Sequence, residues 1–426
     1  MTDRRISHVI TLGLLALMLA TALPWSFAPV AAAPEMKPGQ RAISKNPAIV
    51  ILADGVDPVA AARALGVVPR HVYRDVVTGF AADLPPGSTG AAQRSAGVRE
   101  VTPDGRVTML KKNKKRKNGK KPKSVKPQRV PTGIKRINAA PTPGTRSPRA
   151  DVDVAVLDTG VARVPDLNVA GGRACTGPSP YRDTADHGTH VAGIIGAIDN
   201  TRDVVGVAPG ARIWSVRVLN DKGVGKWSDV LCGLDWVFAR KSTIDVANLS
   251  IGGSGASGPC TSHPVHQAIC RIVNEAGIPV VVAAGNGGKN ASRFIPAAYA
   301  ETIAVSAYAD SNGRPRPSGN VTCDRIPDDH FIPWSNYGPA VDIAAPGACI
   351  LSTTPNRPRR FSGTSMAAPH VSGALARYLA RHPGVGGLAA RDWLLTEAVQ
   401  SQSSIYGFAG GQSISPEPVL WLPEGA

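Results

Sequence analysis

A series of short apolar runs that alternate with segments of helical spacing constrains the fold of this chain most. The runs lie at residues 152–157, 211–219, 244–251, 278–284, 302–307 and 341–345. Segments with helical apolar spacing lie at 187–198, 228–241, 264–276 and 365–381. Continuous apolar runs are typical of parallel strands that are buried on both faces. We therefore predict an α/β fold, a mostly parallel sheet with helices on both faces, whose ligands bind at the carboxyl ends of the strands.

A smaller unit precedes this region. Residues 48–53 form an apolar run, 58–65 a helical patch, 71–77 a second run, and 97–107 a third after a polar turn. The full length of 426 residues is enough for a large core and an accessory domain. We predict a small α+β domain over residues 47–110, a main domain over 128–415 and a C-terminal tail over 416–426.

The first 32 residues resemble an export signal. Arg4 and Arg5 precede an apolar run at 9–25, and small residues follow at 30–33. An uncleaved membrane anchor is the alternative, because Pro34 is unfavourable beside a cleavage site. No later stretch is apolar and long enough to span a bilayer. We expect a secreted, extracellular protein, and we expect it to be a monomer.

All six cysteines lie beyond this signal, and none forms a C-x-x-C pair. In an exported chain, disulfides are the natural interpretation. We predict that sequence neighbours pair, Cys175 with Cys232, Cys260 with Cys270 and Cys323 with Cys349. Isolated buried cysteines are the alternative.

A lysine-rich run interrupts the chain at residues 111–126, where ten of sixteen residues are Lys or Arg and none is acidic. Such a run does not fold alone. Without its ten charges, about +7 of the formal net charge of +17 remains, so the basicity is mostly local. We predict a basic linker at 111–127 and no specific nucleic-acid partner. The linker is either a solvated spacer or a contact to anionic surfaces.

Ser365 lies where a loop is predicted to become a buried helix, a position that suits a nucleophile. Gly363 permits a tight backbone approach, and Pro369 is tolerated in the first turn of the helix that follows. A serine at that position needs a base that takes its proton and donors that stabilise an oxyanion.

Two other segments supply candidate partners. Asp158 ends the first apolar run of the main domain, where a buried carboxylate can orient a histidine. Asp158-Thr159-Gly160 also resembles the aspartic-protease triplet, but such an enzyme needs a second copy, which this sequence lacks. His187 and His190 open a helical segment at a spacing that also suits zinc, although no third ligand or glutamate base lies nearby. We predict that His187 is a general base and His190 a structural neighbour.

Five motifs occur in one order: Leu157-Asp158-Thr159-Gly160, then 187–193, 248–253, 283–286 and 363–370. In these motifs and their order, the chain resembles the subtilisin-like serine proteases from Gln128 almost to its end. The resemblance implies that Ser365 attacks a peptide carbonyl, His187 transfers the proton, and Asp158 holds the imidazole. It also implies an oxyanion hole made by the Ser365 amide and the Asn286 side chain, although Gly-Asn-Gly is also a common turn.

The resemblance further implies how substrate binds. Protein and peptide substrates would pair as an extended strand between Gly223-Val224-Gly225 and Ser250-Ile251-Gly252. A flexible loop is the alternative for the first of these segments. The small domain resembles the family's propeptide, which would act as the enzyme's own inhibitor. We expect self-cleavage after Leu110, and hence preference for apolar residues at the last position before the cut and at the fourth.

A structural calcium ion is the one cofactor that the resemblance implies; no organic cofactor is expected. The matching ligands are side-chain oxygens of Gln128, Asp166 and Asn200 and carbonyls of Ile198, Arg202 and Val204. Arg202 and a segment between Asp158 and Asp166 that is one residue short depart from the pattern, so a solvated polar turn is the alternative.

The function that these features predict is that of a secreted, self-processing serine endopeptidase. The alternative from another class is a binding or adhesion protein on an inactive protease scaffold. Inactive relatives usually lose a member of the triad, whereas Asp158, His187 and Ser365 are all present with Asn286.

Overall fold

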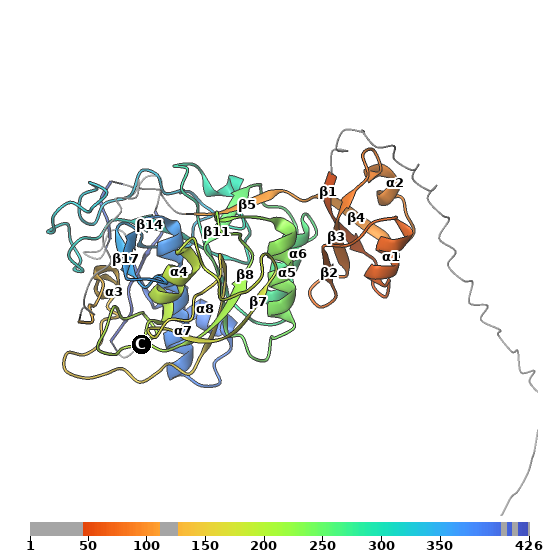
Figure 1. Ribbon diagram of the computed structural model, residues 1–426. Helices are drawn as coiled ribbons and strands as arrows, with labels where there is room; N and C mark the ends of the chain where they lie inside the picture. The colour runs from red at the N-terminus through yellow and green to blue at the C-terminus, as the bar shows by residue number, and fades with distance from the viewer. Residues whose placement is uncertain (1–45, 111–126, 402–406, 411–415, 425–426) are drawn as a thin grey trace, which may run out of the picture.

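The computed structural model describes residues 46–110, 127–401, 407–410 and 416–424. The predicted export signal and residues 111–126 of the predicted linker lie outside them. The described residues form a small domain and a large domain, and strand β5 (Arg106–Met109) extends from the first onto the second (Figure 1). In this part of the chain, no helix has the length and apolar character that crossing a membrane requires.

The large domain is built on a nine-stranded sheet with the order β18-β19-β15-β14-β12-β10-β6-β8-β7. Neighbouring strands are parallel, except for the antiparallel pair β18 and β19. This confirms the predicted α/β class. The bounds are β6 Asp153–Asp158, β7 Asn168–Ala174, β8 Arg212–Arg217, β10 Val246–Leu249, β12 Val280–Ala283, β14 Ile303–Tyr308, β15 Ile343–Pro346, β18 Val399–Gln400 and β19 Val419–Leu420.

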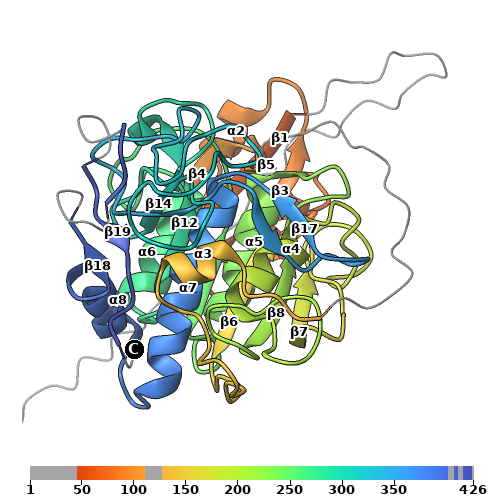
Figure 2. The same ribbon diagram turned by 90° about the vertical axis from the view of Figure 1, so that its left-hand side faces the viewer.

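Helices cover both faces of this sheet, as the continuous apolar strands require. Along β6, Val154 and Val156 face the apolar cluster that includes α4, α7 and α8, whereas Ala155 and Leu157 face the cluster that includes α5 and α6. Helix α7 contacts five central strands and runs along the middle of the domain (Figure 2). The helix bounds are α3 Thr132–Arg136, α4 His187–Gly196, α5 Trp227–Phe238, α6 Pro264–Asn274, α7 Thr364–Arg381 and α8 Gly387–Thr396.

The C-terminal segment differs from the prediction. Residues 416–426 were predicted to be a tail, but Val419 and Leu420 form β19, which pairs with β15 inside the main sheet. Both side chains are fully buried. A strand of two residues carries no periodicity, so the sequence pattern gives no sign of it. Strand β7 and helix α8 were not predicted either.

Smaller elements flank the main sheet. Strand β5 lies between β9 and β11 in a separate four-stranded sheet, and β16 and β17 form an antiparallel pair before α7. Their bounds are β9 Val224–Lys226, β11 Ile251–Ser254, β13 Phe294–Ile295, β16 Ile350–Ser352 and β17 Arg359–Phe361, with a short 3-10 helix at Ala291–Arg293.

The small domain has an antiparallel sheet of the order β2-β3-β1-β4 and two short helices, which confirms the predicted α+β character. Its central strand β3 was not predicted as an element, because Gly79, Ala81 and Ala82 have low strand propensity. Its bounds are β1 Asn46–Leu52, α1 Pro58–Ala64, β2 His71–Tyr73, β3 Gly79–Leu84, α2 Thr89–Gln93 and β4 Val98–Pro103.

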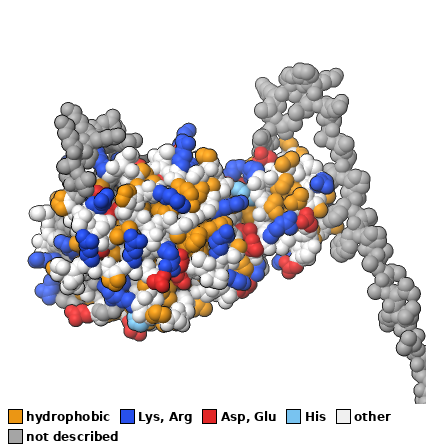
Figure 3. Space-filling view, turned by 60° about the horizontal axis from the view of Figure 1, so that its bottom comes forward, with side chains coloured by type: hydrophobic (Ala, Val, Ile, Leu, Met, Phe, Trp, Pro, Cys, Tyr) orange, Lys and Arg blue, Asp and Glu red, His pale blue; other side chains and the backbone are white. Residues whose placement is uncertain are grey.

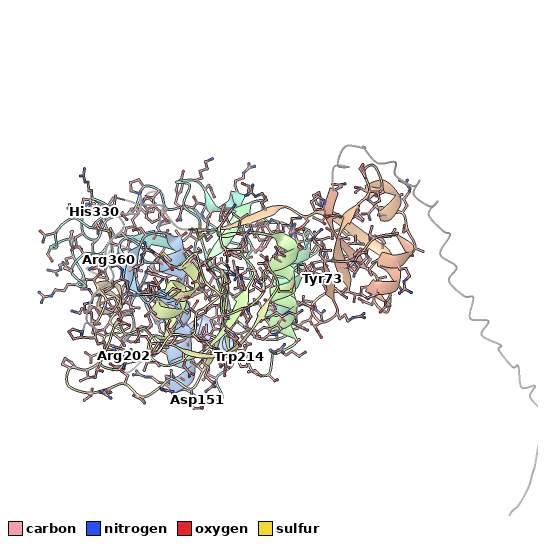
Figure 4. The ribbon with its side chains drawn as sticks, viewed as in Figure 1. Tyr73, Asp151, Arg202, Trp214, His330 and Arg360 are labelled. Atoms are coloured by element: carbon pink, nitrogen blue, oxygen red, sulfur yellow. A yellow bond between two sulfur atoms is a disulfide. The ribbon has the colours of Figure 1, made fainter. Side chains whose placement is uncertain are left out.

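The small domain packs against helices α5 and α6. Ile49, Ile51 and Tyr73 share one apolar cluster with residues of both helices. The Tyr73 hydroxyl, which lies at this contact in Figure 4, donates to the Ser228 carbonyl at 3.0 Å. The Asp104 carboxylate accepts from the Ser228 amide at 2.9 Å and from its hydroxyl at 2.7 Å. An acidic group of the small domain therefore caps the first turn of α5.

Three disulfides join the predicted sequence neighbours: Cys175 with Cys232, Cys260 with Cys270, and Cys323 with Cys349. No cysteine in the described residues is left free.

On the face shown in Figure 3, Lys and Arg side chains are scattered among other residues and do not gather in one patch.

His370 is a fully buried histidine inside α7. Its Nδ1 donates to the Met366 carbonyl at 2.8 Å, and its Nε2 has no hydrogen-bond partner among the described residues. Burial lowers the pKa of the His370 imidazole to about 4. An unfolded histidine has a pKa of about 6.5. Between these values only the unfolded chain binds the proton.

We therefore expect His370 to make the protein less stable as the pH falls from about 6.5 to about 4, by about 3 kcal/mol over the whole interval. Denaturant melts of the His370→Gln variant should lose less stability than the wild type over this range. His382→Gln is the matched control, because His382 makes the same contact with Tyr378 at an exposed position. If wild type and His370→Gln lose stability in parallel, the expectation is wrong.

Candidate active site

Three predicted site residues lie at the carboxyl edge of the main sheet. Asp158 is the last residue of β6, His187 is the first of α4, and Ser365 is the second of α7. All three are fully buried. Gly363, which precedes α7, has a φ of 153°, in the region that favours glycine.

Asp158 and His187 are in direct contact. The imidazole Nδ1 lies 2.7 Å from Asp158 Oδ1, which also accepts the Thr159 amide at 2.7 Å. Because a carboxylate accepts, the imidazole donates through Nδ1 and keeps a lone pair on Nε2. Nε2 is buried and has no hydrogen-bond partner in the described part of the chain. It is therefore available to accept a proton.

Ser365 does not donate to His187 in this structure. Its Oγ donates to the Ser250 carbonyl at 2.8 Å, and the same carbonyl accepts the Leu110 amide at 3.3 Å. Ser365 and Leu110 therefore lie side by side. Contacts between nucleophile and base are often unmade before substrate is bound, and rotation about the Ser365 side-chain bond is the only change that the hydroxyl needs in order to leave Ser250.

Asn286 has a fixed oxygen and a spare donor. Its Oδ1 accepts from the Thr364 amide at 2.9 Å and from the Thr364 hydroxyl at 3.0 Å. These contacts fix the orientation of the side-chain amide and leave the Nδ2 group available to donate. Nδ2 is buried without a hydrogen-bond partner among the described residues. An oriented, unpaired donor beside the nucleophile is suited to stabilising an oxyanion.

The two predicted substrate-binding segments both contact strand β5. Val107 and Thr108 pair with Gly225 and Val224 on β9, and Met109 pairs with Ile251 on β11. The other predicted segment residues lie in the same ladder: Gly252 pairs with Thr108, Gly223 accepts the Met109 amide at 3.0 Å, and Ser250 accepts the Leu110 amide. Strand β5 is thus bound by main-chain hydrogen bonds on both sides.

Gly223 is required for this close approach. Its φ is +71°, and a Cβ there would lie 2.5 Å from the Met109 sulfur. In β5 and the residue after it, the side chains of Val107 and Leu110 are buried, whereas Arg106 and Thr108 are exposed. The large domain therefore encloses the residue that follows the inserted strand and the residue three places before it.

The predicted calcium ligands also lie together. Gln128 Nε2 donates to the carbonyls of Ile198 at 3.0 Å and Val204 at 3.5 Å. Asn200 donates to Asp166 at 2.9 Å. The backbone of Arg202 bridges to Pro127, and its side chain lies at the periphery of the large domain (Figure 4).

This cluster fits a hard cation in its chemistry. Every predicted position offers an amide, carbonyl or carboxylate oxygen. Burial raises the pKa of Asp166, and its two oxygens already accept from Asn200, Thr353 and the Val204 amide. A bound cation would replace some of these hydrogen bonds and favour the ionised carboxylate.

His190 takes the structural position that the sequence predicts. Its Nε2 lies 3.0 Å from the carbonyls of both Ile350 and Arg359, and its ring stacks on Phe361. Within the described ranges, neither His187 nor His190 belongs to a group of three potential metal ligands. The zinc alternative therefore gains no support.

Sequence reasoning missed the residues that hold the site in place. Thr364 orients Asn286. Because Thr364 lies inside the motif around Ser365, its position was a signal from which this role could have been suspected. Asp104 caps α5, and the Trp227 amide donates to the Gly105 carbonyl at 3.0 Å, which extends the pairing of the inserted strand. No local pattern marks these contacts, because the paired residues lie between 78 and 124 positions apart in the sequence.

A buried Ser-His-Asp set beside a spare amide donor and a strand-binding cleft defines the class of serine hydrolases that act on extended peptides. The profile of the subtilase family matches residues 149–409. The chain belongs to this family, and it is a serine endopeptidase.

Several curated relatives are similar over the same region. Subtilisin NAT of Bacillus subtilis subsp. natto is 38% identical over 287 residues, which cover 66% of this chain and 68% of the relative. Subtilisin of Bacillus pumilus is 38% identical over 66% of this chain and 95% of its own length. Subtilisin Savinase of Lederbergia lenta is 36% identical over 66% of this chain and 96% of its own.

Proposed function

We propose that the protein is a secreted serine endopeptidase that is made as a self-processing precursor and prefers apolar residues before the cut bond. One observation carries the proposal. Strand β5 lies in the cleft as a substrate would, and Leu110, the residue that follows it, lies beside Ser365 through the shared Ser250 carbonyl.

The contact between Asp158 and His187 and the unpaired His187 Nε2 support the following roles for the triad. Ser365 Oγ attacks the peptide carbonyl while His187 Nε2 takes its proton, which gives a tetrahedral oxyanion. His187 then returns the proton to the leaving amine, and the acyl group stays on Ser365. Water, deprotonated by His187, attacks this ester; the bond to Ser365 Oγ then breaks, His187 returns the proton to that oxygen, and the new carboxyl group is released. Asp158 keeps the imidazole in the required tautomer and stabilises its charged form.

The oxyanion is stabilised by two donors, the Ser365 amide and Asn286 Nδ2. The burial of Nδ2 without a partner supports this role, because a donor held ready costs no reorganisation when charge develops. Thr364 holds the other end of the same side chain.

The small domain acts as propeptide and inhibitor. Its strand β5 occupies the cleft, and its sheet packs against α5 and α6 in a shared apolar cluster. Self-cleavage breaks the bond between Leu110 and Lys111 and leaves Leu110 as the new carboxyl terminus. The burial of Leu110 and Val107 supports apolar preference at the last and the fourth position before the cut.

The other expected partners follow from the sequence. The export signal would direct the chain out of the cell, and the lysine-rich run would remain at the new amino terminus until it is trimmed. There it is either a spacer or a contact to anionic surfaces. Neither role requires a second copy of the chain, and we propose a monomer.

A calcium ion would be held by Gln128, Asp166 and Asn200 with the carbonyls of Ile198, Arg202 and Val204. Its contribution would be structural. It would tie the start of the large domain to the loop after α4 and take no part in the reaction.

The central test replaces Ser365 with alanine in the full precursor, produced in an exporting host. Wild type should release a fragment that ends at Leu110 and then degrade an unstructured protein; Ser365→Ala should do neither, because it has no nucleophile. Intact mass over time measures both. A folded wild type that remains inert, or a first fragment that consistently ends elsewhere, would contradict the proposal.

Asn286→Leu should lower kcat by about 10² to 10³ while KM changes little, because the lost donor acts on the transition state. Asn290→Leu is the matched control. Asn290 accepts the Ser292 amide at an exposed turn, so its loss should leave kcat unchanged. Steady-state kinetics on a short peptide amide separate the two, and equal kcat values in both variants would remove Asn286 from the oxyanion hole.

Calcium should raise the melting temperature of the Ser365→Ala precursor, and a chelator should reverse the shift. At a hundredfold excess over Kd, the stabilisation should be about 3 kcal/mol, which is at least a few degrees. Asp166→Asn should abolish the response. Asp199→Asn should keep it, because Asp199 lies in the same loop but accepts the Ser147 amide. A melting temperature that ignores the chelator would favour a polar turn without metal.

A further inference from the structure

The carboxylate of Asp183 is buried beside the proposed triad but takes no part in it. Asp183 lies in the loop before α4 and is only 6% exposed. Its Oδ1 accepts the Thr159 hydroxyl at 2.9 Å, and its Oδ2 accepts the Thr189 amide at 2.8 Å and the Thr189 hydroxyl at 2.6 Å. Three donors converge on this one side chain, which is the arrangement that a buried carboxylate requires.

The two threonine hydroxyls among these donors also accept a backbone amide each. Thr159 Oγ1, which donates to Asp183, accepts the Gly188 amide at 3.0 Å. Thr189 Oγ1, which also donates to Asp183, accepts the Ala162 amide at 3.0 Å. A hydroxyl has a single proton, so donation to Asp183 leaves each oxygen free to accept an amide. The carboxylate therefore sets the direction of the whole network.

This network caps helix α4 from outside the helix. The residue before the helix, Asp186, has a left-handed φ of 64°, makes no side-chain cap, and pairs instead with Arg359. The first amides of a helix lack internal partners. Here Thr159 accepts the amide of Gly188, and Asp183 accepts the amide of Thr189.

The cap joins the two elements that carry Asp158 and His187. Thr159 follows Asp158 directly, and Gly188 follows His187 directly. The start of α4 packs closely against the end of β6 and the residues after it. A Cβ on Gly188 would lie 2.2 Å from the Gly160 carbonyl oxygen and 3.1 Å from the Asp158 Cβ. A shift of the helix start would alter the 2.7 Å contact between His187 Nδ1 and Asp158 Oδ1.

We propose that Asp183 is a positioning residue for catalysis, which acts through Thr159 and Thr189 to hold His187 against Asp158. The inference rests on the proposed roles of Asp158 and His187. Asp183 touches neither substrate nor the reacting atoms, so its effect should fall on the chemical step and not on substrate binding.

The first experiment compares Asp183→Ala and Asp183→Asn with wild type, each produced as the full precursor and assayed after the small domain has been removed from the cleft. Asp183→Ala should lower kcat for a short peptide amide by about 30- to 100-fold, in the range that misplaced catalytic groups cost. Asp183→Asn should lose less, because its amide oxygen still accepts. KM should stay within about twofold for both, since β9 and β11 are untouched. Covalent titration with a sulfonyl fluoride counts the competent sites.

The same variants have a second readout that needs no separate maturation. The first-order rate of self-cleavage after Leu110 should fall in the same order as kcat. Asp245→Ala is the matched control. Its carboxylate accepts the Asp153 amide at 2.8 Å, at the opposite end of β6 from Asp158. It removes a partly buried acceptor and should lower stability without lowering kcat.

A second pair of variants leaves Asp183 in place. Thr159→Val removes the hydroxyl that links Asp183 to Gly188, and Thr159→Ser restores it. The valine variant should lose about tenfold in kcat, and the serine variant should return close to wild type. This pair keeps the proposal testable if Asp183→Ala does not fold.

The outcomes separate this inference from the proposed function. If wild type is inert, or if Ser365→Ala still cleaves, the proposed function fails first. If wild type cleaves and Ser365→Ala does not, the positioning role stands or falls by itself. It is overturned if Asp183→Ala keeps kcat within about twofold while losing only stability, or if Thr159→Val and Thr159→Ser have equal kcat values.

Discussion

Parallel strands buried on both faces all end at one edge of the sheet, and the rest of this structure depends on that constraint. Asp158 closes β6 at this edge, and the loops after β10 and β12 bring Ser250 and Asn286 to it. Helices α4 and α7 begin after loop segments, and His187 and Ser365 lie in their first turns. The groups proposed for catalysis lie at one edge because parallel strands place all their carboxyl ends on the same side of the sheet.

Main-chain pairing explains how one cleft can take many sequences. Strand β5 contacts β9 and β11 through amides and carbonyls, and only Val107 and Leu110 are enclosed on all sides. Recognition of this kind asks for an extended segment with two apolar side chains and little else. The breadth of the proposed specificity therefore follows from the number of contacts that do not depend on side chains.

Much of the fold and of the site could be predicted from sequence, for physical reasons. Long apolar strands and amphipathic helices carry their periodicity with them, and Asp158, His187, Ser365 and Asn286 lie in motifs at their ends. Strand β19 has only two residues, so it has no periodicity to detect. Asp183 and Asp104 are acidic residues in loops, and only tertiary contacts reveal that each caps a helix. The sequence also could not indicate that Ser365 donates to Ser250 here.

If the protein is made as the proposed precursor, the cap that Asp104 places on α5 has a consequence for how that precursor would be switched on. Cutting the chain after Leu110 would remove a covalent tether but none of the contacts that hold the small domain. What had been a contact within one molecule, insensitive to concentration, would become an equilibrium between two. The severed domain would rebind in a confined space and leave only on dilution. Under this proposal, the enzyme would stay inhibited where its local concentration is high and become active once it is diluted.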